Sequence, residues 1–143
     1  MRRFIQTAAV LWLIAPALIA QGSIDDQIRD IAGLDPKLAK GFLTYLKQAL
    51  ASGNKEAVSK LIAYPISVSL QGKKREITSR EEFEAHYAEI VTDNVAKAVQ
   101  NQSYEHLSAN SKGVMIGSGE LWFSATKGPS GKFDQYRVIA INN

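Results

Sequence analysis

The residue types best suited to recognition chemistry lie in two strand-like segments near the C-terminus, residues 120–126 and 133–141. If Thr126 pairs with Phe133 across the intervening turn, Trp122 lies opposite Arg137, and a guanidinium over an indole forms a cation–π pair. Side chains alternate along a strand, so one face then carries a polar set. Its members are Glu120, Trp122, Ser124, Gln135 and Arg137. This face predicts a recognition patch or pocket wall; the alternative is an exposed sheet face held by cross-strand pairs.

A second group of side chains has the chemistry of acids and bases in a pocket. Its members are Tyr45, His86, Tyr104 and Glu120. An imidazole exchanges a proton near neutral pH, although a structural hydrogen bond is the alternative for His86. Glu82 and His86 are four residues apart on a predicted helix, which is half of a metal site. No second pair completes it, so no metal is expected. His86 and Tyr104 remain candidate ligand-binding residues beside the polar set.

Several kinds of chemistry are excluded by residue type. The chain of 143 residues contains no cysteine and two histidines, which excludes disulfides, thiol catalysis and histidine-rich zinc sites. Ser118, in the run Gly117-Ser118-Gly119, lies between two predicted strands, whereas a nucleophile elbow or a phosphate loop requires a helix to follow. No cofactor is expected.

The N-terminal residues have the pattern of an export signal. Arg2 and Arg3 precede a thirteen-residue apolar run from Ala8 to Ala20, which is shorter than the roughly 20 residues needed to span a bilayer. We expect cleavage after Gly22, with cleavage after Ala20 or an uncleaved anchor as alternatives. The expected location is therefore periplasmic or secreted, with residues 23–143 forming a single domain.

The charge balance is nearly neutral once the signal is removed. Seventeen Lys and Arg against fourteen Asp and Glu give +3 for the whole chain. Subtracting Arg2 and Arg3 leaves fifteen against fourteen, or +1. Lys73-Lys74-Arg75 forms a short basic run of the kind found in solvated turns, so we expect no nucleic-acid partner.

The first half of the domain has helical spacing. Asp35-Pro36 is a typical helix start, and apolar residues recur three and four apart up to Ser52. Weak spacing over residues 23–34 predicts a short first helix that ends at Gly33. Three further helices are predicted. The first begins at Asn54 and ends at Tyr64-Pro65. The second begins at the capping box formed by Ser79 and Glu82. The third runs from Asp93, its predicted N-cap, to about Asn101.

The strand signals gather mainly at the C-terminal end. Residues 66–71 alternate between apolar and polar side chains and, with a return strand at 75–77, predict a hairpin. Further strands are predicted at 104–109, 113–117, 120–126 and 133–141. Leu121, Phe123, Ala125, Tyr136, Val138 and Ala140 are the predicted core face of the last two. Helices followed by strands indicate an α+β domain in which N-terminal helices pack on a curved antiparallel sheet.

This order of elements, over about residues 35–141, resembles the nuclear transport factor 2-like superfamily, a cystatin-like α+β cone. The segment from Gly113 to Phe123 is also similar to a passage in small uncharacterised exported bacterial proteins. The resemblance implies a curved sheet that wraps the first long helix. The superfamily contains isomerases, dehydratases, hydrolases, ligand binders and interaction modules. No residue here matches the catalytic positions of its ketosteroid isomerase-like members.

The expected function is that of an exported, non-catalytic binding domain. Its partner would be an envelope or periplasmic protein, as for an inhibitor or immunity protein, or a small molecule in the cone. The alternatives are a cone-pocket enzyme and an oligomerisation module that forms a homodimer. An enzyme of this type requires an apolar cavity between helix 36–51 and the sheet, with two or more convergent titratable groups.

Overall fold

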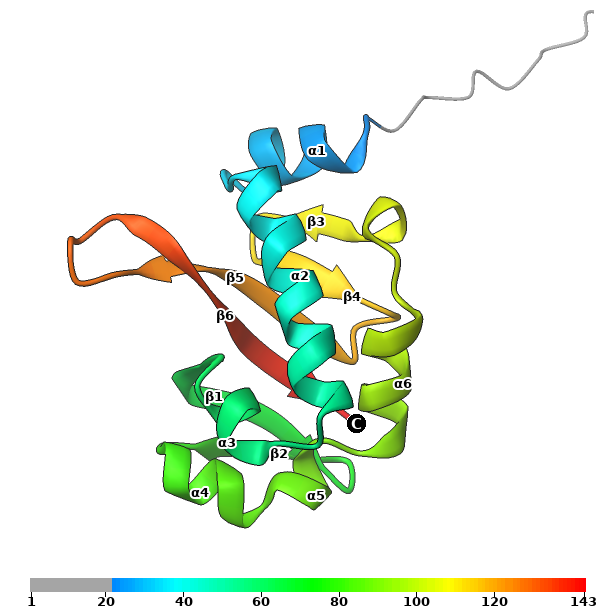
Figure 1. The fold of residues 1–143 in the computed structure, drawn as a ribbon, viewed down its shortest axis with the longest axis vertical. Coiled ribbons are helices and arrows are strands. Elements are labelled where there is room, and N and C mark those ends of the chain that lie inside the picture. The colour runs from blue at the N-terminus through cyan, green and yellow to red at the C-terminus, as the bar shows by residue number, and fades with distance from the viewer. Residues whose placement is uncertain (1–21) are drawn as a thin grey trace, which may run out of the picture.

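A six-stranded mixed sheet forms the framework of the computed structural model, which describes residues 22–143 except for the side chains of residues 133 and 134. The strand order is β2-β1-β6-β5-β4-β3 (Figure 1). The strands are β1 (Ile62–Leu70), β2 (Lys73–Ile77), β3 (Ser108–Asn110), β4 (Gly113–Ile116), β5 (Leu121–Lys127) and β6 (Phe133–Asn142). The predicted export signal, residues 1–22, lies outside the described residues except for Gly22.

The α+β class is confirmed, and one strand pairing distinguishes the sheet from a purely antiparallel one. β1 runs parallel to β6, with Ile62 beside Val138, while all other neighbours are antiparallel. Alternation along each strand identifies its faces but does not identify its neighbour, so the parallel pairing had no local signal.

The helices cover one face and the ends of this sheet. They are α1 (Ile24–Asp26), the π-helix η1 (Gln27–Ile31), α2 (Pro36–Ala51), α3 (Lys55–Ser59), α4 (Arg80–Ala85), α5 (Tyr87–Ile90), α6 (Asp93–Asn101) and the 3-10 helix η2 (Tyr104–His106). Figure 1 shows the long helix α2 crossing in front of the sheet, with α6 beside its C-terminal end. None of the helices in residues 22–143 has both the length and the apolar content that crossing a bilayer requires.

Two predicted helix starts are confirmed by their cap hydrogen bonds. Asp35 Oδ1 accepts from the backbone N–H groups of Lys37 (2.8 Å) and Leu38 (3.4 Å). Asn54 Oδ1 accepts from Ala57 N at 3.0 Å. Each cap satisfies N–H groups that have no partner within their own helix, which is why such starts can be predicted locally.

The cap of α6 is Thr92 and not Asp93, so that prediction is wrong by one residue. Thr92 has extended backbone angles, and its Oγ1 accepts from Val95 N at 3.5 Å. Asp93 is already helical and adds negative charge to the first turn, where the helix dipole favours it. Both residues are good N-caps by type, and only the path of the preceding loop distinguishes them.

Two other predicted boundaries are wrong. The helix that begins at Asn54 ends at Ser59, and Tyr64-Pro65, predicted to end that helix, lies inside β1 with a cis peptide bond. The segment 104–109 was predicted as a strand, yet it contains η2 and joins the sheet only at Ser108. The place of Tyr64-Pro65 in β1 reflects sheet formation, which local spacing does not reveal, whereas at residues 104–106 a 3-10 helix stands where the strand was predicted.

An aromatic cluster fills the space between α2 and the sheet. The Phe42 ring centroid lies 5.1 Å from that of Phe123 and 6.0 Å from that of Tyr136, and the Phe123 and Tyr136 centroids are 6.1 Å apart. Phe123 is fully buried, and the Tyr136 hydroxyl donates to the carbonyl of Asp35 at 2.8 Å. These rings pack α2 against β5 and β6.

Candidate functional site

The register of the β5–β6 hairpin separates the residues that were predicted to form one patch. Trp122 lies opposite Ala140, and Arg137 lies opposite Ser124. The predicted pairing of Trp122 with Arg137 is therefore wrong. Phe133 pairs with Lys127 and not with Thr126, and a register shift between Thr126 and Lys127 moves Arg137 on to Ser124; a second shift, between Trp122 and Phe123, places Trp122 opposite Ala140. A bulge adds a residue to one strand, so every pairing beyond it moves.

The predicted assignment of β5 and β6 residues to the buried and the polar face of the sheet is correct over most of the hairpin, despite these shifts. Leu121, Phe123, Ala125, Tyr136 and Val138 are buried, as predicted. Ala140 is the exception: it lies on the face of Trp122, and Ile141, only 1% exposed, takes the place in the core. The bulge beside Trp122 reverses the alternation at the end of β6.

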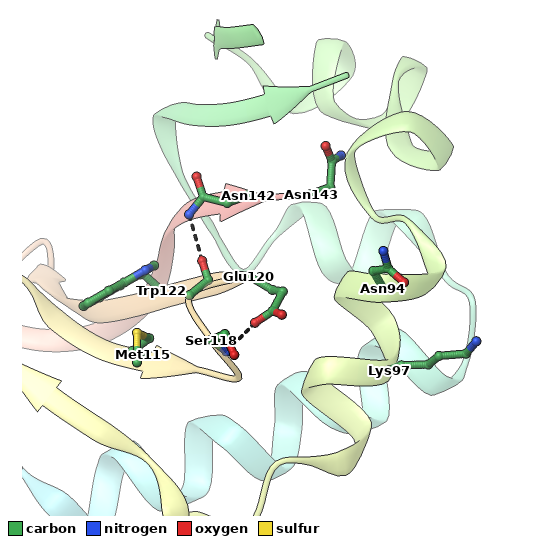
Figure 2. Close-up of a pocket in the computed structure, with 9 residues that line it drawn as sticks. Asn94, Lys97, Met115, Ser118, Glu120, Trp122, Asn142 and Asn143 are labelled. Atoms are coloured by element: carbon green, nitrogen blue, oxygen red, sulfur yellow. Dashed lines mark hydrogen bonds between the residues drawn. The ribbon is translucent and has the colours of Figure 1, made fainter. Parts of the chain in front are cut away.

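Glu120 and Trp122 line a depression of about 630 Å³, which we call the Trp122 groove. Its lining consists of Asn94, Lys97, Met115, Ser118, Gly119, Glu120, Trp122, Asn142 and Asn143. Figure 2 shows the labelled side chains extending from α6, from β4 and β5 and the turn between them, and from the end of β6. Sequence reasoning missed the asparagines, Lys97 and Met115, because none of them belongs to a local motif.

Hydrogen bonds hold the turn that forms one wall of the Trp122 groove. Gly117 N donates to Oε1 of the buried Gln102 at 2.7 Å, and Gly119 N donates to Ile116 O at 3.2 Å. Glu120 Oε2 accepts from Ser118 N at 2.6 Å (Figure 2). The carboxylate of Glu120 is therefore already engaged in holding the turn, which limits its use as a catalytic base.

The two C-terminal asparagines are positioned by their amide nitrogens. Asn142 Nδ2 donates to Gly119 O at 2.8 Å, and Asn143 Nδ2 donates to Glu89 O at 2.7 Å. The backbone N–H of Asn142 also donates to Glu120 O at 2.8 Å. Each side-chain amide is fixed through its nitrogen, and its oxygen is left to accept a hydrogen bond from a ligand.

Gln135 and Arg137 line a different depression, of about 590 Å³, which we call the α2–β6 groove. Its lining consists of Lys37, Leu38, Gly41, Phe42, Tyr45, Leu61, Gln135, Tyr136 and Arg137. Tyr45, a predicted acid or base candidate, is therefore brought together with Gln135 and Arg137. Burial raises the pKa of Tyr136 to about 12, so its hydroxyl stays protonated at neutral pH.

His86 and Tyr104 lie in neither groove. His86 interrupts the predicted helix between α4 and α5, and its Nδ1 lies 3.1 Å from Glu89 Oε1. The predicted pairing of His86 with Glu82 is wrong, because the Glu82 carboxylate accepts instead from Thr78 N at 2.9 Å. Only half of the predicted capping box is present, in which Ser79 Oγ accepts from Glu82 N at 3.1 Å.

Tyr104 has a structural environment. Its hydroxyl donates to Asp25 Oδ1 at 2.8 Å, and Lys40 Nζ lies 5.2 Å from the ring centroid. Burial, followed by the hydrogen bond to Asp25, raises the pKa of Tyr104 well above its usual value. Tyr104 therefore fastens α1 to the rest of the domain and is a poor proton donor near neutral pH.

Within residues 22–143, no group of three or more His, Asp or Glu side chains is arranged to hold a metal ion. Comparison with family models, curated proteins and solved structures found no match for this chain. Because one fold can carry many functions, the function has to be argued from the two grooves.

Proposed function

We propose that this protein is an exported binding domain that takes a polar, uncharged ligand in the Trp122 groove. The observation that carries the proposal is the lining of the groove, where an indole and a thioether are surrounded by three asparagine amides. Such a lining supplies apolar contact and hydrogen bonds, and it contains no matched pair of acid and base.

The side chains suit a ligand with one apolar face and a rim of hydrogen-bonding groups. Trp122 and Met115 are cross-strand partners, so their side chains lie next to each other in the groove (Figure 2). An indole gives a large, rigid contact surface, and amide oxygens of Asn142 and Asn143 accept from hydroxyl or amide N–H groups. Sugar rings, especially N-acetylated ones, have this combination of an apolar C–H face and polar edges.

Binding is favoured over catalysis by the state of the titratable groups. Glu120 is held by Ser118 N, and the interior between α2 and the sheet is occupied by Phe42, Phe123 and Tyr136. In the described lining of the Trp122 groove the titratable side chains are Glu120 and Lys97, and none of the ion pairs among the described residues joins them.

Export and family are part of the same proposal. Arg2-Arg3 and the apolar run to Ala20 support a periplasmic or secreted location. The order from α2 to β6, with helices packed on an open curved sheet, supports membership of the nuclear transport factor 2-like superfamily. That superfamily includes non-catalytic ligand binders as well as enzymes.

Tryptophan fluorescence tests the ligand class directly. The chain has two tryptophans, and removal of the predicted export signal, residues 1–22, takes away Trp12, so residues 23–143 have Trp122 as their single indole reporter. We expect saturable quenching or a spectral shift on titration with N,N′-diacetylchitobiose, and none with an apolar molecule of similar size. Calorimetry should show loss of binding in Trp122→Ala and retention in Ser124→Ala, a control on the same strand and face.

Two outcomes would count against the proposal. One is the absence of a saturable signal across neutral mono- and disaccharides, and the other is calorimetric binding that Trp122→Ala leaves unchanged. Light scattering on the same samples separates ligand binding from self-association. A dimer that Trp122→Ala dissociates would favour the oligomerisation alternative instead.

A further inference from the structure

We propose that the α2–β6 groove, separate from the Trp122 groove, binds an extended segment of a partner protein that carries apolar side chains and a carboxylate. The segment would lie between α2 and the free part of the β6 edge. Three features of the groove carry this inference: exposed apolar side chains, a strand edge that β1 leaves uncovered, and a guanidinium that forms no ion pair with the described side chains.

The helix side of the groove exposes apolar surface to solvent. Leu38 and Tyr45 are 48% and 57% exposed, and they lie two turns apart on one face of α2. Gly41 lies between them, and a side chain there would meet nothing within 4 Å. Because Gly41 has no side chain, Phe42 and Leu61 remain accessible from the groove, and apolar side chains line it continuously from Leu38 to Tyr45.

The strand side of the groove has an open edge. β6 pairs with β5 along its length but meets β1 only from Val138, whose N–H donates to Leu61 O at 2.8 Å. Backbone groups alternate along a strand, so those of Tyr136 face the same side as those of Val138, beyond the start of β1; the Tyr136 carbonyl there accepts from Arg137 Nη1 at 2.8 Å, and an added strand would compete for it. Figure 1 shows this part of the hairpin extending away from the other strands. An edge of this kind accepts an added strand.

The charge of the groove selects an acidic segment. Arg137 donates from Nη1 to Tyr136 O (2.8 Å) and from Nη2 to Gln135 Oε1 (3.0 Å), and both of these acceptors are neutral. None of the ion pairs in the described part of the chain involves Arg137, and the described lining holds no carboxylate. Lys37 adds a second positive charge. A carboxylate from a partner would form a charge-assisted pair with the guanidinium.

The shape of the groove favours a peptide over a small molecule. The depression of about 590 Å³ is shallow and open. Small-molecule sites typically enclose about 70–90% of the ligand surface, whereas an open groove along a helix and a strand edge readily accommodates an extended chain. A partner peptide that lies along the groove needs contact on one side only. Tyrosine and arginine are typical anchor residues at protein–protein interfaces.

A displayed library of random twelve-residue peptides tests the inference on the full-length chain. We expect selection to enrich peptides with apolar residues at every second position and at least one Asp or Glu. Fluorescence anisotropy of the strongest binder should show affinity at least about tenfold weaker for Leu38→Lys and for Arg137→Gln. Gln48→Lys is the matched control, because Gln48 is exposed on the same helix outside the groove and the charge change is identical.

Methylation of alternate backbone nitrogens in the peptide provides a second readout. Strand addition requires peptide N–H groups on one edge, so one of the two alternating methylation patterns should abolish binding while the other keeps it. The inference would be overturned by a library without enrichment, or by binders equally strong toward Leu38→Lys. It would also be overturned by enriched peptides with helical spacing or with lysine in place of the acid.

Discussion

Glu82 joins three segments through one side chain. Its carboxylate accepts from Thr78 N and Thr78 Oγ1, at 2.9 and 3.1 Å, and from Arg75 Nη2 at 3.1 Å. It thereby ties the end of the β1–β2 hairpin to the first turn of α4, where a negative charge is also favoured by the helix dipole. The backbone hydrogen bond from Thr78 is the main reason that the pKa of Glu82 lies below its usual value.

Replacement of this carboxylate should make stability less dependent on pH. The pKa of Glu82 is lower in the folded state than in the unfolded chain. Its carboxylate therefore contributes to the free energy of unfolding at pH values above the ordinary pKa of 4.5, and this contribution is lost as the pH falls through the pKa of the folded state. We expect Glu82→Gln to lower the melting temperature at neutral pH and to match the wild type at about pH 2. Glu81→Gln, one residue away, is the control; equal effects of both variants at neutral pH would contradict the assignment.

At the scale of elements, glycines at two positions have opposite roles. Gly113 begins β4 with φ +141°, and a Cβ there would lie 2.6 Å from Phe123 O on the neighbouring strand. The close approach of β4 to β5, which places Met115 beside Trp122, therefore depends on glycine. Gly41, in the middle of α2, has open space around it, and its effect on stability is to weaken its helix.

These two glycines should respond in opposite directions to the same substitution. Gly113→Ala is expected to cost about 1–3 kcal/mol in free energy of unfolding, since both the backbone angle and the contact with Phe123 are strained. Gly41→Ala is expected to add about 0.5–1 kcal/mol through helix propensity. Chemical denaturation measures both values, and a neutral Gly113→Ala would show that the strands can separate without cost.

At the scale of the whole molecule, the aromatic cluster links α2 to the last two strands. Phe42 comes from the helix, while Phe123 and Tyr136 come from β5 and β6. The cluster therefore packs the long helix directly against both strands of the β5–β6 hairpin.

Truncation within this cluster should be among the most destabilising single changes. Phe123→Ala removes a fully buried ring and leaves a cavity, so we expect a loss of about 3–5 kcal/mol in free energy of unfolding. Ser124→Ala, on the opposite face, should stay within about 0.5 kcal/mol of the wild type. A loss below about 1 kcal/mol in Phe123→Ala would indicate that the interior is loosely packed.

Local features of the sequence were sufficient to determine the helix starts at Asp35 and Asn54, the β-hairpins and the buried faces of most strands. Caps and alternation depend on residues within a few positions of each other, so the chain carries this information locally. The helix predicted from Ser79 is interrupted at His86, and the N-cap of α6 is Thr92 instead of Asp93. Both differences change the bounds of helices, and neither changes the fold class.

Only the tertiary structure decided which side chains meet. The pairing of Lys127 with Phe133 and the register shift next to it place Arg137 opposite Ser124 instead of Trp122, and the parallel pairing of β1 with β6 leaves part of the β6 edge uncovered by β1. Asn94 and Asn142 reach one groove from elements that lie far apart in the chain. Register and neighbour choice depend on contacts summed over the whole sheet, and a shift of one residue exchanges the two faces. The sequence alone therefore determined the fold class, and packing across the sheet decided how many grooves it carries and what lines each of them.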